Sequence, residues 1–289
     1  MHYSGAVYRP PSEAHSLIVQ CTLGCSHNRC AFCIMYKAKQ FSINPIEQVL
    51  GDLAEARAQY PYIERIFLAD GDALILPMDY LLTVLDDIRE RFPECERVSA
   101  YASTKALMRK SDAELQTLRE HGLALVYVGL ESGSEELLEK YDKGVTVEEI
   151  VTHSLRAKAA GMALSVTAIN GMGGREQSEA HAIATAAALS RIKADYVAML
   201  TLRVYSGTPL HDWIERGELT MLGPKELAAE NRIILQHIDS DGSVFRSNHA
   251  SNYLPLKGTL NRDRDALIEQ IDKALAGEVR FRRAVELGL

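Results

Sequence analysis

Residues 17–33 read LIVQCTLGCSHNRCAFC, an apolar run that leads directly into a loop carrying Cys25, Cys30 and Cys33. An apolar run of this length is typical of a buried strand. Three thiolates on one short loop can hold three irons of a [4Fe–4S] cube and leave the fourth iron open. An open iron can bind a substrate or cofactor. This stretch therefore predicts a catalytic metal centre, and not a structural one, at the end of the first strand.

The same loop also allows a structural zinc site. Cys30 and Cys33 form a C-x2-C pair, and Cys21, Cys25 and His27 are available to complete four ligands. Cys21 lies within the apolar run, where we expect a buried small side chain and not a ligand. A disulfide framework is not expected, because the chain has five cysteines, an odd number, in 289 residues.

The composition is that of an ordinary enzyme. With 289 residues and 47% hydrophobic side chains, the chain can bury a core the size of one barrel domain. We expect a cytoplasmic protein, because there is no apolar run of membrane length and no signal-peptide pattern, and unpaired thiols suit a reducing compartment. The net charge of −7 disfavours broad docking on nucleic acid.

Short apolar runs alternate with helix-period segments, which predicts parallel strands joined by helical crossovers. We predict an α/β fold: a partial (β/α)6 barrel of the TIM type over 1–216, with a short helical extension packed on it over 217–289. A doubly wound sheet would give the same alternation. Helix starts are indicated by capping boxes at Ser111 with Glu114 and at Thr146 with Glu149. The predicted strands are 17–21, 65–69, 98–102, 124–130, 163–169 and 196–204.

Polar or glycine-rich residues follow most of these strands. In such folds the carboxyl ends of the strands carry the site. The polar residues after any one strand are typical of a turn. Because they follow several strands at the same end, we call them strand edges and predict that they form one binding site. The edges are Asp70-Gly71-Asp72, Ser103 with Thr104, Gly129-Leu130-Glu131-Ser132-Gly133, and Asn170-Gly171.

Together these stretches resemble a radical S-adenosylmethionine (SAM) enzyme, over about residues 17–216. The resembling branch includes the elongator catalytic subunit, methylthiotransferases and oxygen-independent coproporphyrinogen oxidase. The resemblance lies in the cysteine loop with Phe32 before its last cysteine, the Glu131 edge followed by Lys143-Gly144, and the run 206–210, SGTPL. One departure is clear: four residues separate Cys25 from Cys30, where the family usually has three. We expect a one-residue bulge in the loop; otherwise the metal site differs.

The resemblance implies two cofactors, a [4Fe–4S] cluster and SAM, and an oxygen-sensitive enzyme. It implies that Cys25, Cys30 and Cys33 bind the cluster, whose reduced form cleaves SAM to a 5′-deoxyadenosyl radical that acts on a small or medium organic substrate. Asp70, Gly71 and Asp72 are then expected at the SAM ammonium, Glu131 at the ribose, and Ser103 or Arg156 at the carboxylate. Around the adenine the resemblance implies Phe32, the stretch from Ile169 through Asn170 to Gly171, and Leu202.

The substrate is less well specified. Residues that flank the predicted mouth, or lie in the polar tail that follows it, are Tyr36, Lys37, Arg203, Tyr205, His249 and Asn252. An electron donor such as flavodoxin or ferredoxin is the expected protein partner. Two other functions compete: an RNA-modifying radical SAM enzyme, which would need a basic RNA-binding region, and a non-enzymatic module that holds zinc or an iron–sulfur cluster.

Overall fold

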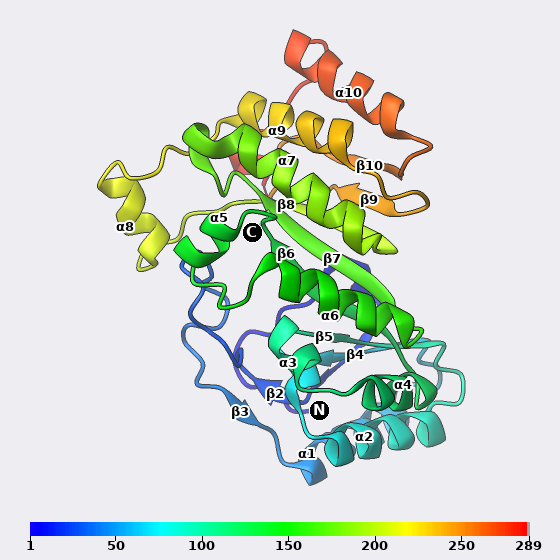
Figure 1. The fold of residues 1–289 in the computed structure, drawn as a ribbon. Coiled ribbons are helices and arrows are strands. Elements are labelled where there is room, and N and C mark those ends of the chain that lie inside the picture. Colours follow the sequence, from blue (N-terminus) through cyan, green and yellow to red (C-terminus); the bar gives the residue numbers. More distant parts are fainter. Residues whose placement is uncertain (288–289) are drawn as a thin grey trace. The chain divides into compact units, whose positions relative to one another are not determined.

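A computed structural model describes residues 1–287, which fall into two compact units (Figure 1). Unit 1 comprises residues 1–28, 33–128 and 152–164, and unit 2 comprises residues 29–32, 129–151 and the chain from residue 165 onward. The chain therefore passes between the units several times, and the cysteine loop is one of these passages. The predicted domain boundary at residue 216 stays a prediction.

Unit 1 is built on four parallel strands in the order β1-β4-β5-β6, and helices lie along them. Consecutive strands are joined through helices, which is what parallel pairing requires. Helices α1 and α2 pack against each other. The strands are β1 (Leu17–Gln20), β4 (Arg65–Ala69), β5 (Arg97–Tyr101) and β6 (Leu123–Glu131), the last of which enters unit 2 at Gly129. The helices are α1 (Ile46–Gln59), α2 (Met78–Arg91), α3 (Thr104–Met108) and α4 (Asp112–Glu120). A small antiparallel pair, β2 (Thr22–Leu23) and β3 (Ser42–Ile43), brackets the cysteine loop.

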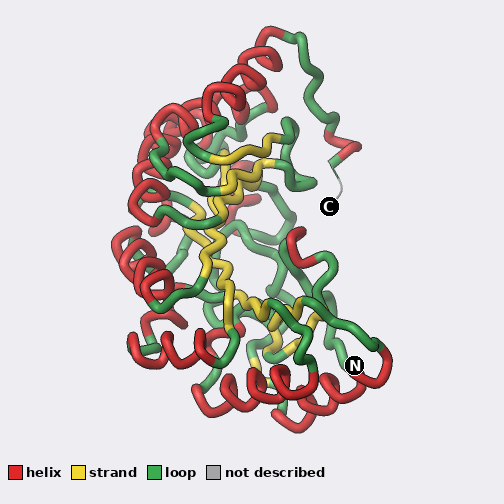
Figure 2. The backbone as a smooth tube through the Cα atoms, turned by 90° about the vertical axis from the view of Figure 1, so that its right-hand side faces the viewer, coloured by secondary structure: helices red, strands yellow, loops and turns green. Residues whose placement is uncertain are grey.

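Unit 2 contains β7 (Ala163–Asn170, from Ser165 onward) and β8 (Tyr196–Thr201), which pair in parallel. Two further strands, β9 (Val244–Ser247) and β10 (Leu256–Thr259), continue from β8, β9 parallel to it and β10 antiparallel to β9. Helix α7 packs on α9, and α9 packs on α10, so these helices form one layer beside the strands (Figure 2). The helices are α5 (Glu135–Lys140), α6 (Val147–Ala159, leaving the unit at Thr152), α7 (Gly174–Ile192), α8 (Pro209–Glu215), α9 (Pro224–His237) and α10 (Arg264–Ala276).

All six predicted strands are present, each within two or three residues of its expected bounds. Both predicted capping boxes also form: the Glu114 amide is 3.2 Å from Ser111 Oγ, and the Glu149 amide is 3.1 Å from Thr146 Oγ1. β9 and β10 were not predicted, because β9 alternates apolar with polar residues over only four positions and β10 follows a polar stretch that begins at Ser247. The α/β class with mostly parallel strands is confirmed.

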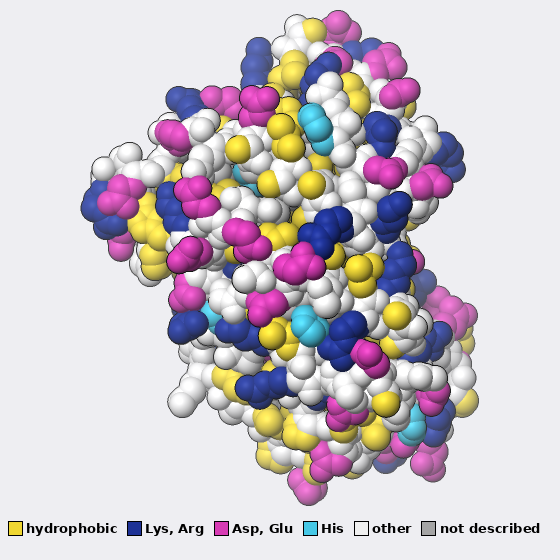
Figure 3. All heavy atoms as spheres, in the orientation of Figure 1, with side chains coloured by type: hydrophobic (Ala, Val, Ile, Leu, Met, Phe, Trp, Pro, Cys, Tyr) yellow, Lys and Arg dark blue, Asp and Glu magenta, His cyan; other side chains and the backbone are white. Residues whose placement is uncertain are grey.

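No helix among residues 1–287 is both long enough and apolar enough to cross a bilayer. On the face of these residues drawn in Figure 3, basic and acidic side chains are interspersed and form no single basic field. The weak electrostatic attraction for nucleic acid that the net charge of −7 indicates stays a prediction.

Candidate active site

The cysteines differ in burial, and burial decides which of them suit a metal. Among the described residues none of the five cysteines forms a disulfide, and Cys25, Cys30 and Cys33 are partly exposed. Cys21 is fully buried, and burial raises the pKa of its thiol to about 12, with Asp52 adding to the effect. Because the thiolate is the metal-binding form, Cys21 is a poor ligand. The interpretation of Cys21 as a core residue is confirmed.

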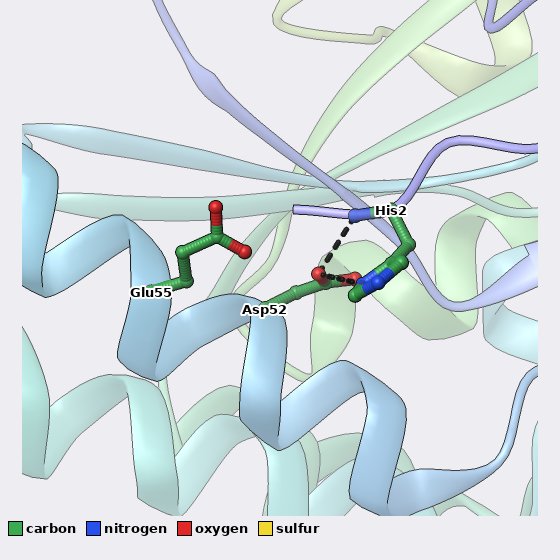
Figure 4. A group of neighbouring side chains, drawn as sticks. All are labelled: His2, Asp52 and Glu55. Atoms are coloured by element: carbon green, nitrogen blue, oxygen red, sulfur yellow. Dashed lines mark hydrogen bonds and ion pairs between the residues drawn. The ribbon is translucent and has the colours of Figure 1, made fainter.

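Among residues 1–287, one group of three side chains brings possible metal-ligand atoms within 4.8 Å of one another, and it contains no cysteine. It consists of His2, Asp52 and Glu55, which lie near the start of the chain and on α1 (Figure 4). The Asp52 carboxylate accepts a hydrogen bond from the His2 amide at 2.7 Å and lies 2.9 Å from its Nδ1, while the Met1 amine contacts Glu55. The amine and the imidazole already satisfy both carboxylates, so this group is an ion-pair cluster.

The end of β4 is a dense polar edge within unit 1. Both Asp70 and Asp72 are completely buried. Lys39 pairs with Asp70 at 2.7 Å, so the buried charge has a cationic partner. Asp72 accepts hydrogen bonds from the Ser103 amide at 2.9 Å and from Ser103 Oγ at 2.7 Å. Asp70 Oδ1 is buried and has no hydrogen-bond partner, which leaves one acceptor at this edge.

The end of β6 holds Glu131 in a strained but well-supported position. Glu131 has a φ of 62°, in the left-handed region, and its Oε1 lies 2.7 Å from Lys143 Nζ. The side chain folds back over Gly129, where a Cβ would lie 2.1 Å from Glu131 Oε1. Both charged side chains are largely shielded, with 13% exposed for Glu131 and 17% for Lys143. The predicted ribose carboxylate is thus an oriented acceptor at a strand end.

The end of β7 combines an apolar surface with an unsatisfied amide. Phe32 packs against a core cluster of unit 2 that includes Ile169 and Leu202, so three residues predicted around the adenine lie together. Asn170 is completely buried, and neither atom of its side-chain amide has a hydrogen-bond partner. A buried amide without partners costs free energy, and such groups in native structures call for an explanation.

A buried network beneath these edges was missed by the sequence analysis. His181 of α7 places Nδ1 2.9 Å from Ser132 Oγ and Nε2 3.1 Å from the Ile169 carbonyl, and burial lowers its pKa to about 4. Glu230 of α9 accepts hydrogen bonds from the Gly171 amide at 2.6 Å and from Ser178 Oγ at 2.5 Å. Burial raises the pKa of Glu230 to about 7. In the sequence, the only signal for His181 and Glu230 is that each falls on the apolar face of its predicted helix.

The Arg156 guanidinium, predicted at the SAM carboxylate, already donates hydrogen bonds to other residues of unit 1. Its NH2 group donates to the Lys110 carbonyl at 2.6 Å and its Nε donates to Asp112 at 2.5 Å, so it joins α6 to the end of α3 and the start of α4. Ser103 is likewise engaged, because its Oγ donates to Asp72 and accepts from the Ala106 amide at 3.0 Å. Binding a carboxylate at either residue requires an exchange of these partners.

The residues predicted at the substrate divide into two sets. Tyr36 is buried, and its pKa is raised by burial first, then by the neighbouring Tyr101 and by Asp70. Lys37 is exposed and donates to the Asn28 carbonyl at 2.8 Å. In unit 2, Arg203 and Tyr205 are partly exposed on the segment after β8.

The polar tail, residues 247–258, is held in place by hydrogen bonds of its own side chains. The Asn252 amide spans Thr201 Oγ1 at 2.8 Å and the Met199 carbonyl at 2.7 Å, so it fastens the tail to β8. His249 Nδ1 lies 2.9 Å from Ser251 Oγ, and burial lowers its pKa. The tail therefore covers the end of β8 with its own hydrogen bonds.

Parallel strands that end in polar edges, together with a cysteine loop that follows the first strand, are the arrangement expected of an α/β enzyme. The sequence profile of the radical SAM superfamily matches residues 19–189, and the chain belongs to this superfamily. It is an enzyme of that superfamily, and the predicted cofactors, a [4Fe–4S] cluster and SAM, are those of the superfamily.

One curated protein is similar in sequence over most of the chain. An uncharacterized methyltransferase of Pyrococcus horikoshii is 24% identical over 243 residues, which are 82% of this chain and 51% of that protein. The chain thus spans about half the length of this curated relative.

Solved structures of radical SAM enzymes share the fold. Methylornithine synthase (PylB) has a TM-score of 0.57 at 15% identity, covering 89% of this chain and 68% of that chain. The methyltransferase TsrM from Kitasatospora setae, with tryptophan and a SAM analog bound, has a TM-score of 0.57 at 21% identity, covering 71% and 39%. The archaeal Elp3 of Methanocaldococcus infernus has a TM-score of 0.55 at 15% identity, covering 91% and 63%.

Proposed function

We propose that this chain cleaves SAM reductively and directs the resulting radical at a small or medium organic substrate. The observation that carries the proposal is the loop of Cys25, Cys30 and Cys33 within the matched superfamily region. These three cysteines would hold the [4Fe–4S] cluster, and the chemistry that the reduced cluster would supply is one-electron cleavage of a carbon–sulfur bond of SAM to methionine and a 5′-deoxyadenosyl radical.

The residues present fit these cofactors. The three thiols are partly exposed, unlike the buried Cys21, and none is in a disulfide, as ligands of a cluster must be. Unsatisfied buried polar atoms stand at two strand ends, Asp70 Oδ1 after β4 and the Asn170 amide at the end of β7. Such atoms are what a polar ligand would satisfy.

Each part of SAM has a proposed counterpart. The ammonium group is accepted at the Asp70 edge, where Oδ1 lacks a partner. The ribose hydroxyls donate to Glu131, which Lys143 holds in place at 2.7 Å. The adenine would lie against the apolar side chains of Phe32 and Leu202, and the Asn170 amide, which lacks a hydrogen-bond partner, would be a polar contact for it. Gly71, Asp72 and Gly171 contribute backbone and support, and Ser103 or Arg156 meets the carboxylate after giving up a present partner.

The reducing partner and the setting follow from this chemistry. The electron is proposed to come from a flavodoxin or ferredoxin in a reducing compartment, because a low-potential donor is needed to reduce such clusters. Tyr36, Lys37, Arg203, Tyr205, His249 and Asn252 remain the proposed surroundings of the substrate. Asn252 and His249 would act through the tail that they order. Nucleic acid is not proposed as substrate.

The test is anaerobic reconstitution with iron and sulfide, followed by reduction with dithionite in the presence of SAM. Formation of 5′-deoxyadenosine and methionine in equal amounts is the expected result, and the Cys25→Ala variant is the control that should give neither. A wild-type protein with a full cluster and no cleavage would contradict the proposal. Stoichiometric zinc without SAM binding would favour the binding module instead.

A second candidate function is methyl transfer from SAM, which the curated relative from Pyrococcus horikoshii favours because it is named a methyltransferase. In this reaction the methyl group moves to the substrate and S-adenosylhomocysteine is left. The same incubation separates the two functions once a methyl acceptor is added, because S-adenosylhomocysteine and 5′-deoxyadenosine are distinct products. Accumulation of S-adenosylhomocysteine alone would replace the first proposal with the second.

A further inference from the structure

The β4 edge contacts both neighbours of Cys25 in the chain. On one side, the Gly24 amide donates to Asp70 Oδ2 at 3.2 Å, and the Gly24 carbonyl accepts from the Gly71 amide at 3.0 Å. On the other side, the Ser26 hydroxyl donates to Asp72 Oδ2. Three consecutive residues of the edge therefore hold the two residues that flank one cysteine. All of these contacts lie within unit 1.

A second layer fixes the edge itself. Lys39 Nζ lies 2.7 Å from Asp70 and 2.5 Å from the Ala6 carbonyl, so it ties the end of the cysteine loop to the β4 edge and to the N-terminal segment. Asp72 is held by the amide and hydroxyl of Ser103 at the start of α3. Both carboxylates are therefore fixed by groups other than the two residues that flank Cys25.

Gly71 brings the backbone of the edge against the cysteine. A Cβ at Gly71 would lie 3.0 Å from the Cβ of Cys25 and 2.7 Å from a ring carbon of Tyr36. Approaches this close leave no room for a side chain. The absence of a side chain at residue 71 thus lets Cys25 sit directly on the end of β4.

We infer that Asp70, Gly71 and Asp72 form a clasp that positions the Cys25 thiolate for its iron. This inference rests on the proposed function, because it concerns one ligand of the cluster. Asp72 is a positioning residue in this scheme, and its contacts with Ser26 and Ser103 replace the contact with the SAM ammonium that the resemblance implies. Asp70 acts in both roles: Oδ2 belongs to the clasp, and Oδ1 is left for SAM.

The experiment compares Asp72→Ala, Asp72→Asn and Ser26→Ala with Asp265→Ala, an exposed aspartate of α10, as the matched control. Each protein is reconstituted anaerobically, and three quantities are measured: iron per chain, the rate of iron loss to a chelator, and the electron paramagnetic resonance (EPR) spectrum with and without SAM. Far-ultraviolet circular dichroism of the metal-free proteins checks folding. Ser26→Ala removes one exposed hydroxyl, so it tests the clasp even if Asp72→Ala does not fold.

The expected result is about tenfold faster iron loss in Asp72→Ala, as for other residues that orient metal ligands. Ser26→Ala should lose iron faster by a smaller factor. Asp72→Asn should retain iron and its SAM response, because an amide can replace the hydrogen bonds to both serines. If Asp72 instead binds the SAM ammonium, both Asp72 variants will keep iron and lose the SAM-induced EPR change, which overturns the clasp. Wild-type protein that takes up no cluster refutes the proposed function, a different outcome.

Discussion

Replacing the buried Glu230 with glutamine should stabilise the protein at neutral and alkaline pH. Glu230 is completely buried, and its two hydrogen bonds, from Gly171 and Ser178, do not offset the loss of water around an ionised carboxylate. Burial raises its pKa from 4.5 to about 7. The glutamine side chain would keep the bond from the Gly171 amide through its Oε1 and donate from its Nε2 to Ser178 Oγ.

The sign and size follow from the raised pKa of Glu230. An acid whose pKa is higher in the folded than in the unfolded chain costs stability once it ionises, so stability falls as the pH rises from about 4.5 to about 7 and then stays level. The difference between 4.5 and about 7, at about 1.4 kcal/mol per pH unit, corresponds to about 3 kcal/mol. We expect Glu230→Gln to gain about 1–3 kcal/mol at pH 8 and little at pH 5.

The assay is urea unfolding of the metal-free protein from pH 5 to pH 8.5. The matched control is Glu179→Gln, an exposed glutamate on α7 near Ser178, which should leave the pH profile unchanged. His181, with its pKa lowered to about 4, makes stability fall as the pH drops below about 6.5. Its Nε2 lies 3.9 Å from Glu230 Oε1, so the substitution also changes the His181 contribution, and the comparison therefore rests on pH 7 to 8.5, where His181 is neutral. Equal stability of wild type and Glu230→Gln at pH 8, or a difference that does not change with pH, would refute the reasoning.

Three further predictions concern the ligands and the edges. Alanine at Cys25, Cys30 or Cys33 should abolish iron binding after reconstitution, whereas Cys21→Ala should retain it; loss of iron in Cys21→Ala would contradict the ligand set. Lys143→Met should weaken SAM binding about tenfold by releasing Glu131, as measured by calorimetry with loaded protein, and the exposed control Lys225→Met should not. His181→Ala should lower the free energy of unfolding by about 2–3 kcal/mol, because it removes the hydrogen bonds to Ser132 Oγ and to the Ile169 carbonyl and empties a buried site; a change below about 0.5 kcal/mol would argue against the network.

The sequence predicts the regular part of this fold well for a physical reason. Strands such as 65–69 are buried on both faces and therefore read as continuous apolar runs, and the intervening helices show one apolar face. Capping boxes add local signals that do not depend on distant contacts, as at Ser111 and Thr146. β9 and β10 lack both signals, since their residues alternate with polar side chains and pair at the edge of the strands of unit 2.

The candidate site is predicted less completely, because a sequence position does not reveal whether a polar side chain is already engaged. Arg156 has the chemistry to bind a carboxylate, yet in the structure Asp112 and two carbonyls occupy its donors. Asn252 is predicted near the substrate, and its amide is already engaged with the Met199 carbonyl of β8. Conversely, Glu230 lies far along the chain in a helix, and only the tertiary fold brings it to the Gly171 amide.

The edge after β6 explains why a short motif can be a stronger guide than any single residue in it. Gly129 leaves the space that the Glu131 carboxylate fills, Glu131 takes the left-handed conformation that turns it toward Lys143, and Ser132 turns the other way to meet His181. The residue types at Gly129 and Glu131 therefore depend on a contact with a residue close to them in the sequence. A motif built this way specifies the direction of a carboxylate, which is what binding of a ribose needs, whereas an isolated glutamate at a strand end specifies only a charge.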